Sequence, residues 1–215
     1  MIDLHSHTLI SDGVLIASEL ANRAKAAGYK ALAITDHADA SNLEEVLEQI
    51  LKFTTTYGDD DFKVISGVEL THAPPKQIPG LVERARALGA QVVLVHGETM
   101  VEPVPRGTNK AAIEAKVDIL AHPGLITEED TKLAASNGVI FEITTRHGHS
   151  FTNGHVGTMA KKHGVEMVLN SDTHGPGDLI TTEKALNVVL GAGMNENDFR
   201  RMEDNARKLL EKVCS

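Results

Sequence analysis

The sequence predicts an α/β fold built on a parallel sheet, because seven short apolar runs alternate with helical patterns along the whole chain. With 215 residues the chain is long enough to bury a sizeable core, and we expect a single domain over residues 1–215. A closed barrel and an open doubly wound sheet both fit the alternation. No G-x-G-x-x-G pattern follows the first apolar run, which counts against the dinucleotide-binding form of the open sheet.

Each predicted strand is a short run of β-prone, apolar residues, typical of a parallel strand that is buried on both faces. The first run leads into the two histidines of IDLHSH (2–7) near the start of the chain. The other six runs are ALAIT (31–35), KVISGVEL (63–70), QVVLVH (91–96), VDILAH (117–122), GVIFEI (138–143) and EMVLNSD (166–172).

The predicted helices lie between these strands and carry apolar residues on one face. In NLEEVLEQIL (42–51), the leucine, valine and isoleucine side chains repeat at helical spacing. Glycines suited to a helix C-cap close two others, at Gly28 after ASELANRAKAA and at Gly89 after residues 81–88. Further helical patterns cover residues 111–116, 156–163, 181–190 and 196–212, and three prolines mark residues 71–79 as a loop.

Charge and composition exclude several classes of function. The formal net charge of −9 argues against a broad electrostatic contact with nucleic acid, so we do not expect a long nucleic-acid partner. A small anionic substrate is compatible with this charge, because bound cations can reverse its local sign. We expect no signal peptide and no membrane span, since Asp3 and the histidines interrupt the first apolar stretch and no later run is long enough. The single cysteine, Cys214, allows no intrachain disulfide and fits a reducing, cytoplasmic compartment.

Every predicted strand ends in a histidine or a carboxylate, and in a parallel barrel these ends meet on the face that holds the active site. Imidazole and carboxylate groups are ligands for zinc, manganese and iron. The predicted ligands are His5, His7, Asp12, His37, Glu69, His96, His122, Asp172 and His174. One ion does not need nine ligands, so the pattern favours a cluster of ions.

Other polar residues receive supporting roles. Glu142 ends the sixth strand, and we expect it to accept a hydrogen bond from a ligand rather than to bind metal. Asp36 is expected to orient a ligand histidine in the same way. His72, His155 and His163 have no placement at a strand end, and we expect them in loops or on the surface.

The motifs DLHSHTLISDG, AITDH, GVE, VH, AHPG and SDTH, in this order, resemble those of the polymerase-and-histidinol-phosphatase (PHP) superfamily over almost the whole chain. The resemblance implies a distorted (β/α)7 TIM-like barrel and two to three divalent ions. It implies that His5, His7, Glu69 and Asp172 hold one metal, that Glu69 bridges to a second metal with His96 and His122, and that a third takes Asp12, His37 and His174. All of these ligand positions are filled, whereas the family also includes inactive members that have lost them.

Clustered divalent metals suit phosphoester hydrolysis by a metal-activated hydroxide. We therefore expect a phosphatase of small phosphomonoesters that resemble histidinol phosphate, a sugar phosphate or a nucleotide, with Glu69 and Asp172 as bridging carboxylates. A phosphodiesterase or exonuclease acting on nucleic-acid ends is an alternative, as is a non-catalytic metal-binding subunit. No Ser, Cys or Thr stands in a nucleophile motif beside a base, so a covalent mechanism has no support. The sequence leaves the oligomeric state open.

Two loops at strand ends offer cationic groups that could orient a phosphate. EPVPRGTNK carries Arg106 and Lys110, and TTRHGHS carries Arg146, His147 and His149. Arg106, Arg146 and His149 are candidate substrate contacts, and Lys110 is expected to be solvated. His147 or His149 could protonate the leaving group, and the sequence does not distinguish between them.

Overall fold

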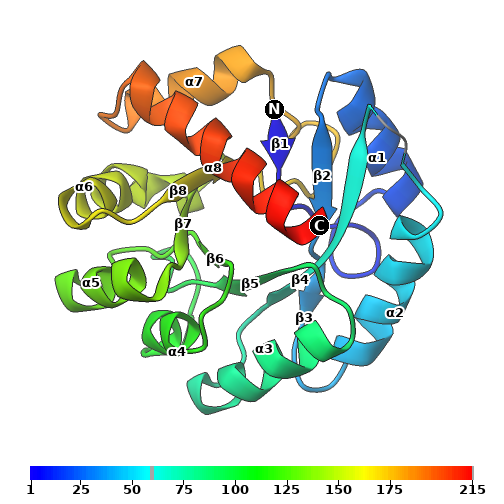
Figure 1. Cartoon of the computed structure of the whole chain (residues 1–215), viewed down its shortest axis with the longest axis horizontal. Helices are drawn as coiled ribbons and strands as arrows, with labels where there is room; N and C mark the ends of the chain where they lie inside the picture. The colour runs from blue at the N-terminus through cyan, green and yellow to red at the C-terminus, as the bar shows by residue number, and fades with distance from the viewer. Residues whose placement is uncertain (59–60, 215) are drawn as a thin grey trace.

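The computed structural model describes residues 1–58 and 61–214 and shows a nearly closed barrel of parallel strands (Figure 1). The strands follow chain order around it: β1 (Ile2–Asp3), β2 (Ala31–Ile34), β4 (Lys63–Leu70), β5 (Val92–His96), β6 (Ile119–Ala121), β7 (Ile140–Thr144) and β8 (Met167–Asn170). An additional short strand, β3 (His37–Ala38), pairs with the end of β4. The expected seven-stranded TIM-like barrel is thereby confirmed.

The barrel closes between the first and last strands through a few specific contacts. A parallel bridge joins Ser6 to Thr173, and the His7 amide donates to the Thr173 carbonyl oxygen over 2.8 Å. Between β1 and β8, a side chain replaces a backbone acceptor, since the Leu4 amide donates to Asn170 Oδ1 over 2.9 Å. This substitution explains why β1 is shorter than the strand predicted to run to the histidines.

Helices cover the outside of the barrel. In the described residues they are α1 (Ala17–Ala26), α2 (Leu43–Thr54), α3 (Ile78–Ala87), α4 (Thr108–Glu114), α5 (Glu128–Asn137), α6 (Asn153–His163), α7 (Thr182–Gly191) and α8 (Glu196–Cys214), with short 3₁₀ turns at Pro75–Gln77 and His149–Thr152. The loop predicted over residues 71–79 ends early, because α3 begins at Ile78 and accommodates Pro79 in its first turn, where no amide donor is needed.

Helix α5 was not among the predicted helices, although both of its ends carry recognisable capping residues. The Thr127 side chain accepts a hydrogen bond from the Asp130 amide, which caps the N-terminus. Gly138 ends the helix in the left-handed conformation, with φ of 70°. The face of α5 carries few apolar residues, so helical periodicity alone gave a weak signal.

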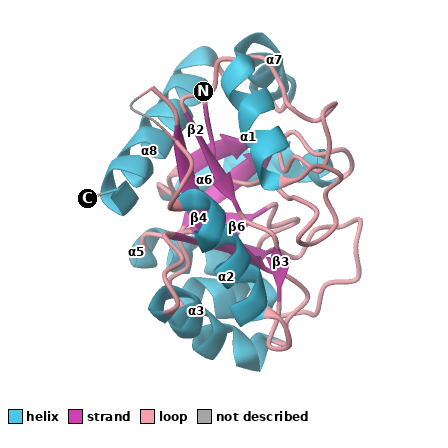
Figure 2. Ribbon diagram, turned by 90° about the vertical axis from the view of Figure 1, so that its right-hand side faces the viewer, coloured by secondary structure: helices cyan, strands magenta, loops and turns pink. Residues whose placement is uncertain are grey.

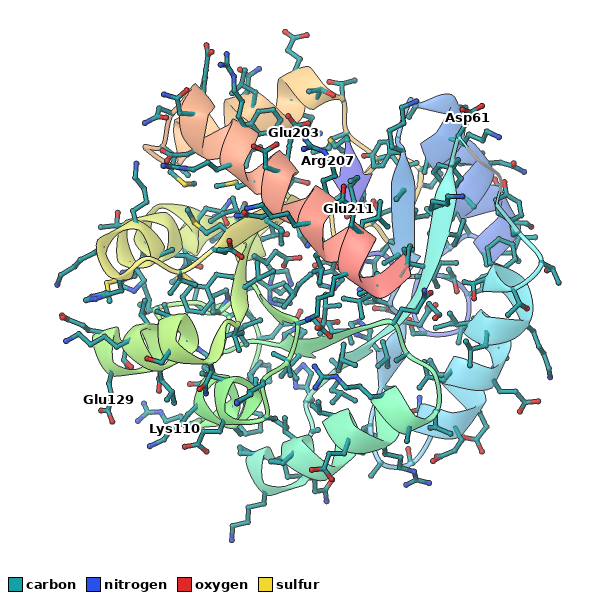
Figure 3. All side chains as sticks on the ribbon, viewed as in Figure 1. Asp61, Lys110, Glu129, Glu203, Arg207 and Glu211 are labelled. Atoms are coloured by element: carbon teal, nitrogen blue, oxygen red, sulfur yellow. The ribbon has the colours of Figure 1, made fainter. Side chains whose placement is uncertain are left out.

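Two apolar clusters hold the barrel together. The larger one packs the outward side chains of the strands against the surrounding helices. The smaller one fills the barrel interior, with Ala33, Ile65 and Leu94 among its members, and includes Ala206 and Leu209 of α8. Figure 1 shows α8 lying across one end of the barrel. In Figure 3, Glu203, Arg207 and Glu211 project from the other side of this helix. One end of the barrel is therefore plugged by an amphipathic helix.

The opposite end is left to the loops that follow the strands. In Figure 2, these loops gather on the right-hand side of the molecule, whereas α8 and the C-terminus lie on the left. The predicted metal ligands belong to this loop-bearing end. Across the described residues, no helix has both the length and the apolar character that crossing a bilayer requires.

The packing of the loop after β6 can be tested at Gly124, with Gly138 at the end of α5 as a control that has nearly the same backbone conformation. Gly124 and Gly138 have φ of 67° and 70°, but only Gly124 lies against other backbone, where an added Cβ would collide with the Glu98 carbonyl oxygen. We expect Gly138→Ala to cost about 1–2 kcal/mol, the penalty of the left-handed conformation. Gly124→Ala should cost about 3–5 kcal/mol, because backbone must also move. Urea unfolding of both variants measures the difference, and equal losses would contradict the packing.

Candidate metal centre

All nine predicted ligands lie together at the carboxyl ends of the strands. His5, His7 and Asp12 follow β1, His37 opens β3, Glu69 belongs to β4, and His96 is the last residue of β5. His122 follows β6, while Asp172 and His174 follow β8. In the described part of the chain, five groups of side chains have potential ligand atoms within 4.8 Å of one another, and the nine predicted ligands all belong to these groups.

Two buried carboxylates lie among the innermost histidines. Glu69 Oε1 is 3.4 Å from His5 Nε2 and 3.6 Å from His122 Nε2. Asp172 Oδ1 is 3.2 Å from His7 Nε2 and 3.7 Å from His5 Nε2. Glu69 and the three imidazoles are almost fully buried, and Asp172 is 3% exposed. These contacts fit the pairing of Glu69 and Asp172 with His5 and His7 that the family resemblance implied.

A second group lies closer to solvent and joins Asp12 to two histidines. Asp12 Oδ1 is 3.2 Å from His174 Nε2 and 3.4 Å from His37 Nε2. His7 belongs to the same group. The third set of ligands that the resemblance implied is thus assembled in the fold.

Hydrogen bonds to the Nδ1 atoms fix which nitrogen of each imidazole faces the centre. His5 Nδ1 lies 2.8 Å from Glu142 Oε1, His96 Nδ1 lies 3.1 Å from the Gly97 carbonyl oxygen, and His174 Nδ1 lies 3.0 Å from the Asp172 carbonyl oxygen. These oxygens only accept, so each Nδ1 carries the hydrogen and a neutral ring presents its Nε2 lone pair to a carboxylate. The Nε2 lone pair and the carboxylate oxygen are both hydrogen-bond acceptors, so a proton or a cation must lie between them.

Glu142 has the supporting position expected from the sequence. Its Oε1 accepts from His5 and from Asn170 Nδ2 (2.8 Å), and its Oε2 accepts from the His122 backbone amide (3.1 Å). Asp36 differs from expectation: instead of a histidine, it binds the Thr8 amide and hydroxyl and the Ser11 amide and hydroxyl. Because these groups belong to the loop that carries Asp12, Asp36 positions a ligand through the backbone.

Buried polar atoms without a hydrogen-bond partner are concentrated at the candidate metal centre. Among the described residues, seven buried side-chain atoms lack a hydrogen-bond partner, and six of them belong to the predicted ligands. They are His5 Nε2, both ring nitrogens of His7, Glu69 Oε1, His122 Nδ1 and Asp172 Oδ1; the seventh is His163 Nε2. Leaving a buried polar group unsatisfied costs about 1–3 kcal/mol, so this concentration fits metal ligands.

Burial and mutual repulsion perturb the ionisation of these groups in the absence of metal. Burial beside Glu69 and Glu142 raises the pKa of Asp172 to about 7. Burial and the neighbouring His96 hold the pKa of His122 well below its usual range. Burial lowers the pKa of His37, but its contacts with Asp12 and Glu69 outweigh this effect and raise it to about 10. Protons thus occupy part of the centre, and binding a cation must displace them.

The backbone is strained at two of the ligands. His122 and Asp172 have φ of 28° and 52°, values that non-glycine residues seldom adopt. Such conformations cost roughly 1–3 kcal/mol each and persist where the surroundings hold them. Both residues directly follow a strand, and their side chains contact the histidines and carboxylates of the centre, with His122 Nε2 3.8 Å from Asp172 Oδ2.

Three further residues join the centre. His149 lies in a group with His96 and His122, and its Nε2 is 3.3 Å from Glu102 Oε1. Glu102 Oε2 is also 3.1 Å from His96 Nε2 and 3.1 Å from His72 Nε2. The expectation for His72, a loop position, is met, but its imidazole points to the centre. Sequence reasoning missed Glu102 because it lies six residues past a strand end, in a loop whose path no periodicity predicts.

A polar cavity of about 280 Å³ opens above the ligands and is lined by both Arg146 and His149. A second cavity of similar size, lined by Arg146 and His147, lies beside it. Arg146 is 3.3 Å from Asp178 and is partly exposed.

The structure does not bring Arg106 to either cavity, and Lys110 points away from the barrel (Figure 3). His155 and His163 lie on α6, and the His155 ring bonds the Ile126 carbonyl oxygen.

The fold and site define a barrel protein with a candidate multinuclear metal centre. The chain belongs to the PHP domain family, which matches residues 3–184, so the family predicted from the motifs is confirmed. An uncharacterized protein of Methanocaldococcus jannaschii is 49% identical over 200 residues, 92% of either chain. Ribonuclease P protein component 3 of Methanosarcina barkeri is 26% identical over 205 residues, which cover 88% of this chain and 80% of that protein.

Solved structures share the fold at low sequence identity. A chain from the cryo-EM structure of archaeal ribonuclease P with mature tRNA superposes with a TM-score of 0.72 at 19% identity, covering 99% of this chain and 91% of that one. Histidinol phosphate phosphatase of Lactococcus lactis, solved with zinc, L-histidinol and phosphate, gives a TM-score of 0.64 at 17% identity, covering 90% of this chain and 94% of that one.

Metal removal tests the centre directly. Purified without chelator, the protein should contain more than one transition-metal ion per chain by elemental analysis. Dialysis against EDTA should lower Tm, and added Mn²⁺ or Zn²⁺ should restore it, because each ion present at a hundred times its Kd contributes about 2.7 kcal/mol to folding. An unchanged Tm together with an absence of bound metal would show that protons alone satisfy the ligands.

Proposed function

We propose that this protein is a metal-dependent phosphatase of small phosphomonoesters. The observation that carries the proposal is the set of unpartnered, buried ligand atoms beneath a polar cavity that also contains an arginine. Buried groups of this kind are costly to a fold and are retained where they bind something. A cavity of about 280 Å³ suits a small substrate better than a polymer.

The ligand set favours zinc, manganese or iron, because imidazole and carboxylate groups predominate. When bound, such ions would supply a water of lowered pKa and offset the charge of a phosphoryl group. The chain's own residues have separate tasks in this scheme. Glu69 and Asp172 would share their charge between ions, and Glu142 would keep His5 oriented through its Nδ1 hydrogen bond.

Arg146 is the residue best placed to bind the phosphate of the substrate. It lines the cavity together with Asp12, Asp172 and His174, and its guanidinium can bind two phosphoryl oxygens at once. Asp178 holds the guanidinium from behind, at 3.3 Å, and also accepts hydrogen bonds from the His174 and Gly175 amides. This shared partner couples the position of Arg146 to the loop that carries a ligand.

The two histidines of the same loop have different surroundings. Burial and the nearby His96 lower the pKa of His149 to about 4, so its ring is neutral near pH 7 and suits binding rather than proton donation. His147 lines the neighbouring cavity with Arg146. We therefore propose His149 as a contact for substrate or metal, and we keep His147 as the candidate proton donor for a leaving group that extends into that cavity.

Action on nucleic-acid ends is the second candidate, and the likeness to ribonuclease P protein component 3 favours it. A related observation is that, in the described residues, every exposed large apolar side chain except Leu190 of α7 lies in a segment between a strand and the next α-helix; these are Leu9, Val14, Ile16, Met100, Val101, Leu125 and Phe151. A partner or a base could contact them. The net charge of −9 counts against extended RNA contact.

A panel of substrates separates these functions. We expect metal-loaded protein to release phosphate from small phosphomonoesters and to leave short single strands of DNA and RNA intact. Preferential shortening of the strands would assign the protein to the second candidate. Binding of RNA by gel shift, without turnover of any substrate, would assign it to a non-catalytic role.

The shared carboxylates should be indispensable for turnover. Glu69→Gln and Asp172→Asn should each lower kcat by about a thousandfold, since each removes charge at the metal centre worth several kcal/mol. Circular dichroism should show that the fold is retained. His163→Ala, on the outer helix α6, serves as the control and should keep nearly full activity. Equal losses in the control and in Asp172→Asn would place the active site elsewhere.

Arg146 and Arg106 can be compared in one experiment. Arg146→Ala should lower kcat/KM by about a hundredfold, the scale for loss of one charged transition-state donor, with metal content unchanged. Arg106→Ala should have little effect, because that side chain is exposed and lines neither cavity. Near-wild-type kinetics for both variants would show that the metals alone hold the phosphate.

A further inference from the structure

Two residues outside the set that the family resemblance implied, His72 and Glu102, form a ligand group with His96 at the mouth of the cavity. His72 follows β4, His96 ends β5 and Glu102 belongs to the loop after β5. Their potential ligand atoms lie within 4.8 Å of one another. His72 and Glu102 are exposed, whereas His96 is buried. The group therefore reaches from solvent to the buried centre.

Two distances in this group are close to those between ligands of a tetrahedral ion. Glu102 Oε2 is 3.1 Å from His72 Nε2 and 3.1 Å from His96 Nε2. Ligand atoms at 2.0–2.1 Å from a tetrahedral zinc ion are about 3.3 Å apart. Glu102 supplies a negative charge, and the two imidazoles supply neutral donors, which is a ligand set that zinc and related ions accept.

His96 can serve only one ion at a time. Its Nδ1 hydrogen is donated to the Gly97 carbonyl oxygen, so Nε2 offers the one lone pair that the ring has left. Through that nitrogen His96 contacts Glu102 in the outer group, and His96 is also a member of an inner, buried group with His122 and His149. When an ion fills the inner group and binds His96, an ion in the outer group loses His96 as a ligand. The outer ion must then dissociate, or it must itself be the ion that moves to the inner group.

The loop that carries Glu102 is fixed in place beside the inner group. Thr99 Oγ1 is 2.8 Å from His149 Nδ1, and Glu102 Oε1 is 3.3 Å from His149 Nε2. Glu102 thus contacts the outer group through one oxygen and the inner group through the other. A carboxylate in this position can stay in contact with a cation as the cation passes from one group to the next.

We propose that His72, His96 and Glu102 form an outer divalent-cation site through which metal enters and leaves the buried centre. The outer site is occupied transiently, because full occupancy of the inner group claims the same nitrogen of His96. The proposal needs metal binding by the centre but does not depend on which phosphate ester the protein hydrolyses.

The rate of metal loading tests this proposal. Protein freed of metal by EDTA dialysis is mixed with Co²⁺, and the visible absorption of bound Co²⁺ is followed in a stopped-flow instrument. The His72→Ala/Glu102→Gln double variant should load about tenfold more slowly than the wild-type chain, the scale on which supporting residues affect metal sites. Its final Co²⁺ content by elemental analysis should equal that of the wild type.

A matched control is available on the outer helices. His163 Nε2 lies 3.4 Å from Glu128 Oε1, a histidine–glutamate pair of similar geometry that belongs to none of the ligand groups found in the described residues. The His163→Ala/Glu128→Gln variant should load at the wild-type rate. The release of Co²⁺ from loaded protein into excess EDTA tests the same site without the need for metal-free protein. The His72→Ala/Glu102→Gln variant should release Co²⁺ about tenfold more slowly than the wild type.

Two results would overturn the proposal. Equal loading and release rates in all three proteins would show that Glu102 and His72 form only an ion pair. A double variant that lacks one Co²⁺ per chain at saturation would make these residues permanent ligands rather than an entry site. Either result leaves the phosphatase proposal standing, which fails separately if a fully loaded wild-type chain hydrolyses no phosphate ester.

Discussion

The burial of Glu69 and Asp172 in the mouth of one small barrel is the constraint on which the rest of the site depends. Two carboxylates and a ring of imidazoles share a volume from which water is largely excluded. Such a cluster destabilises a fold unless positive charge is present, because like charges repel strongly where the dielectric constant is low. Divalent cations satisfy this requirement and also provide the chemistry of a phosphoesterase.

The supporting residues show how the barrel holds ligands against that repulsion. Glu142 bonds both a ligand side chain and the backbone of another ligand, so two strands are aligned through one carboxylate. Asp36 acts on the loop before Asp12 in a comparable way. At the other end of the barrel, α8 covers the interior with apolar side chains. The apolar plug formed by α8 and the polar site therefore lie at opposite ends of the barrel.

Much of this arrangement was predictable. The strands were found because buried parallel strands are short, apolar and bounded by polar residues, and KVISGVEL matches β4 in full. The candidate ligands were predicted to lie together because each strand ends where the loops of the active-site face begin, and the structure places all nine at that face. The helix α5 was missed because its apolar residues do not repeat clearly at helical spacing. Its capping residues were the main indication of a helix. The hydrogen bonds of Asp36 were also unpredictable, because they depend on how the loop after β1 folds back.

The sequence by itself determined the alternation of strands and helices and the nine candidate ligand positions, because these follow from local periodicity and from the residues at strand ends. The barrel and the family followed from the resemblance of its motifs to the PHP superfamily. Only the tertiary structure decided which further side chains reach the centre. Glu102, His72 and His149 come from three loops whose paths depend on packing between distant segments, so no spacing along the chain reveals their meeting. The paths of the loops also decide that Arg146 lines the cavity and that Arg106 does not.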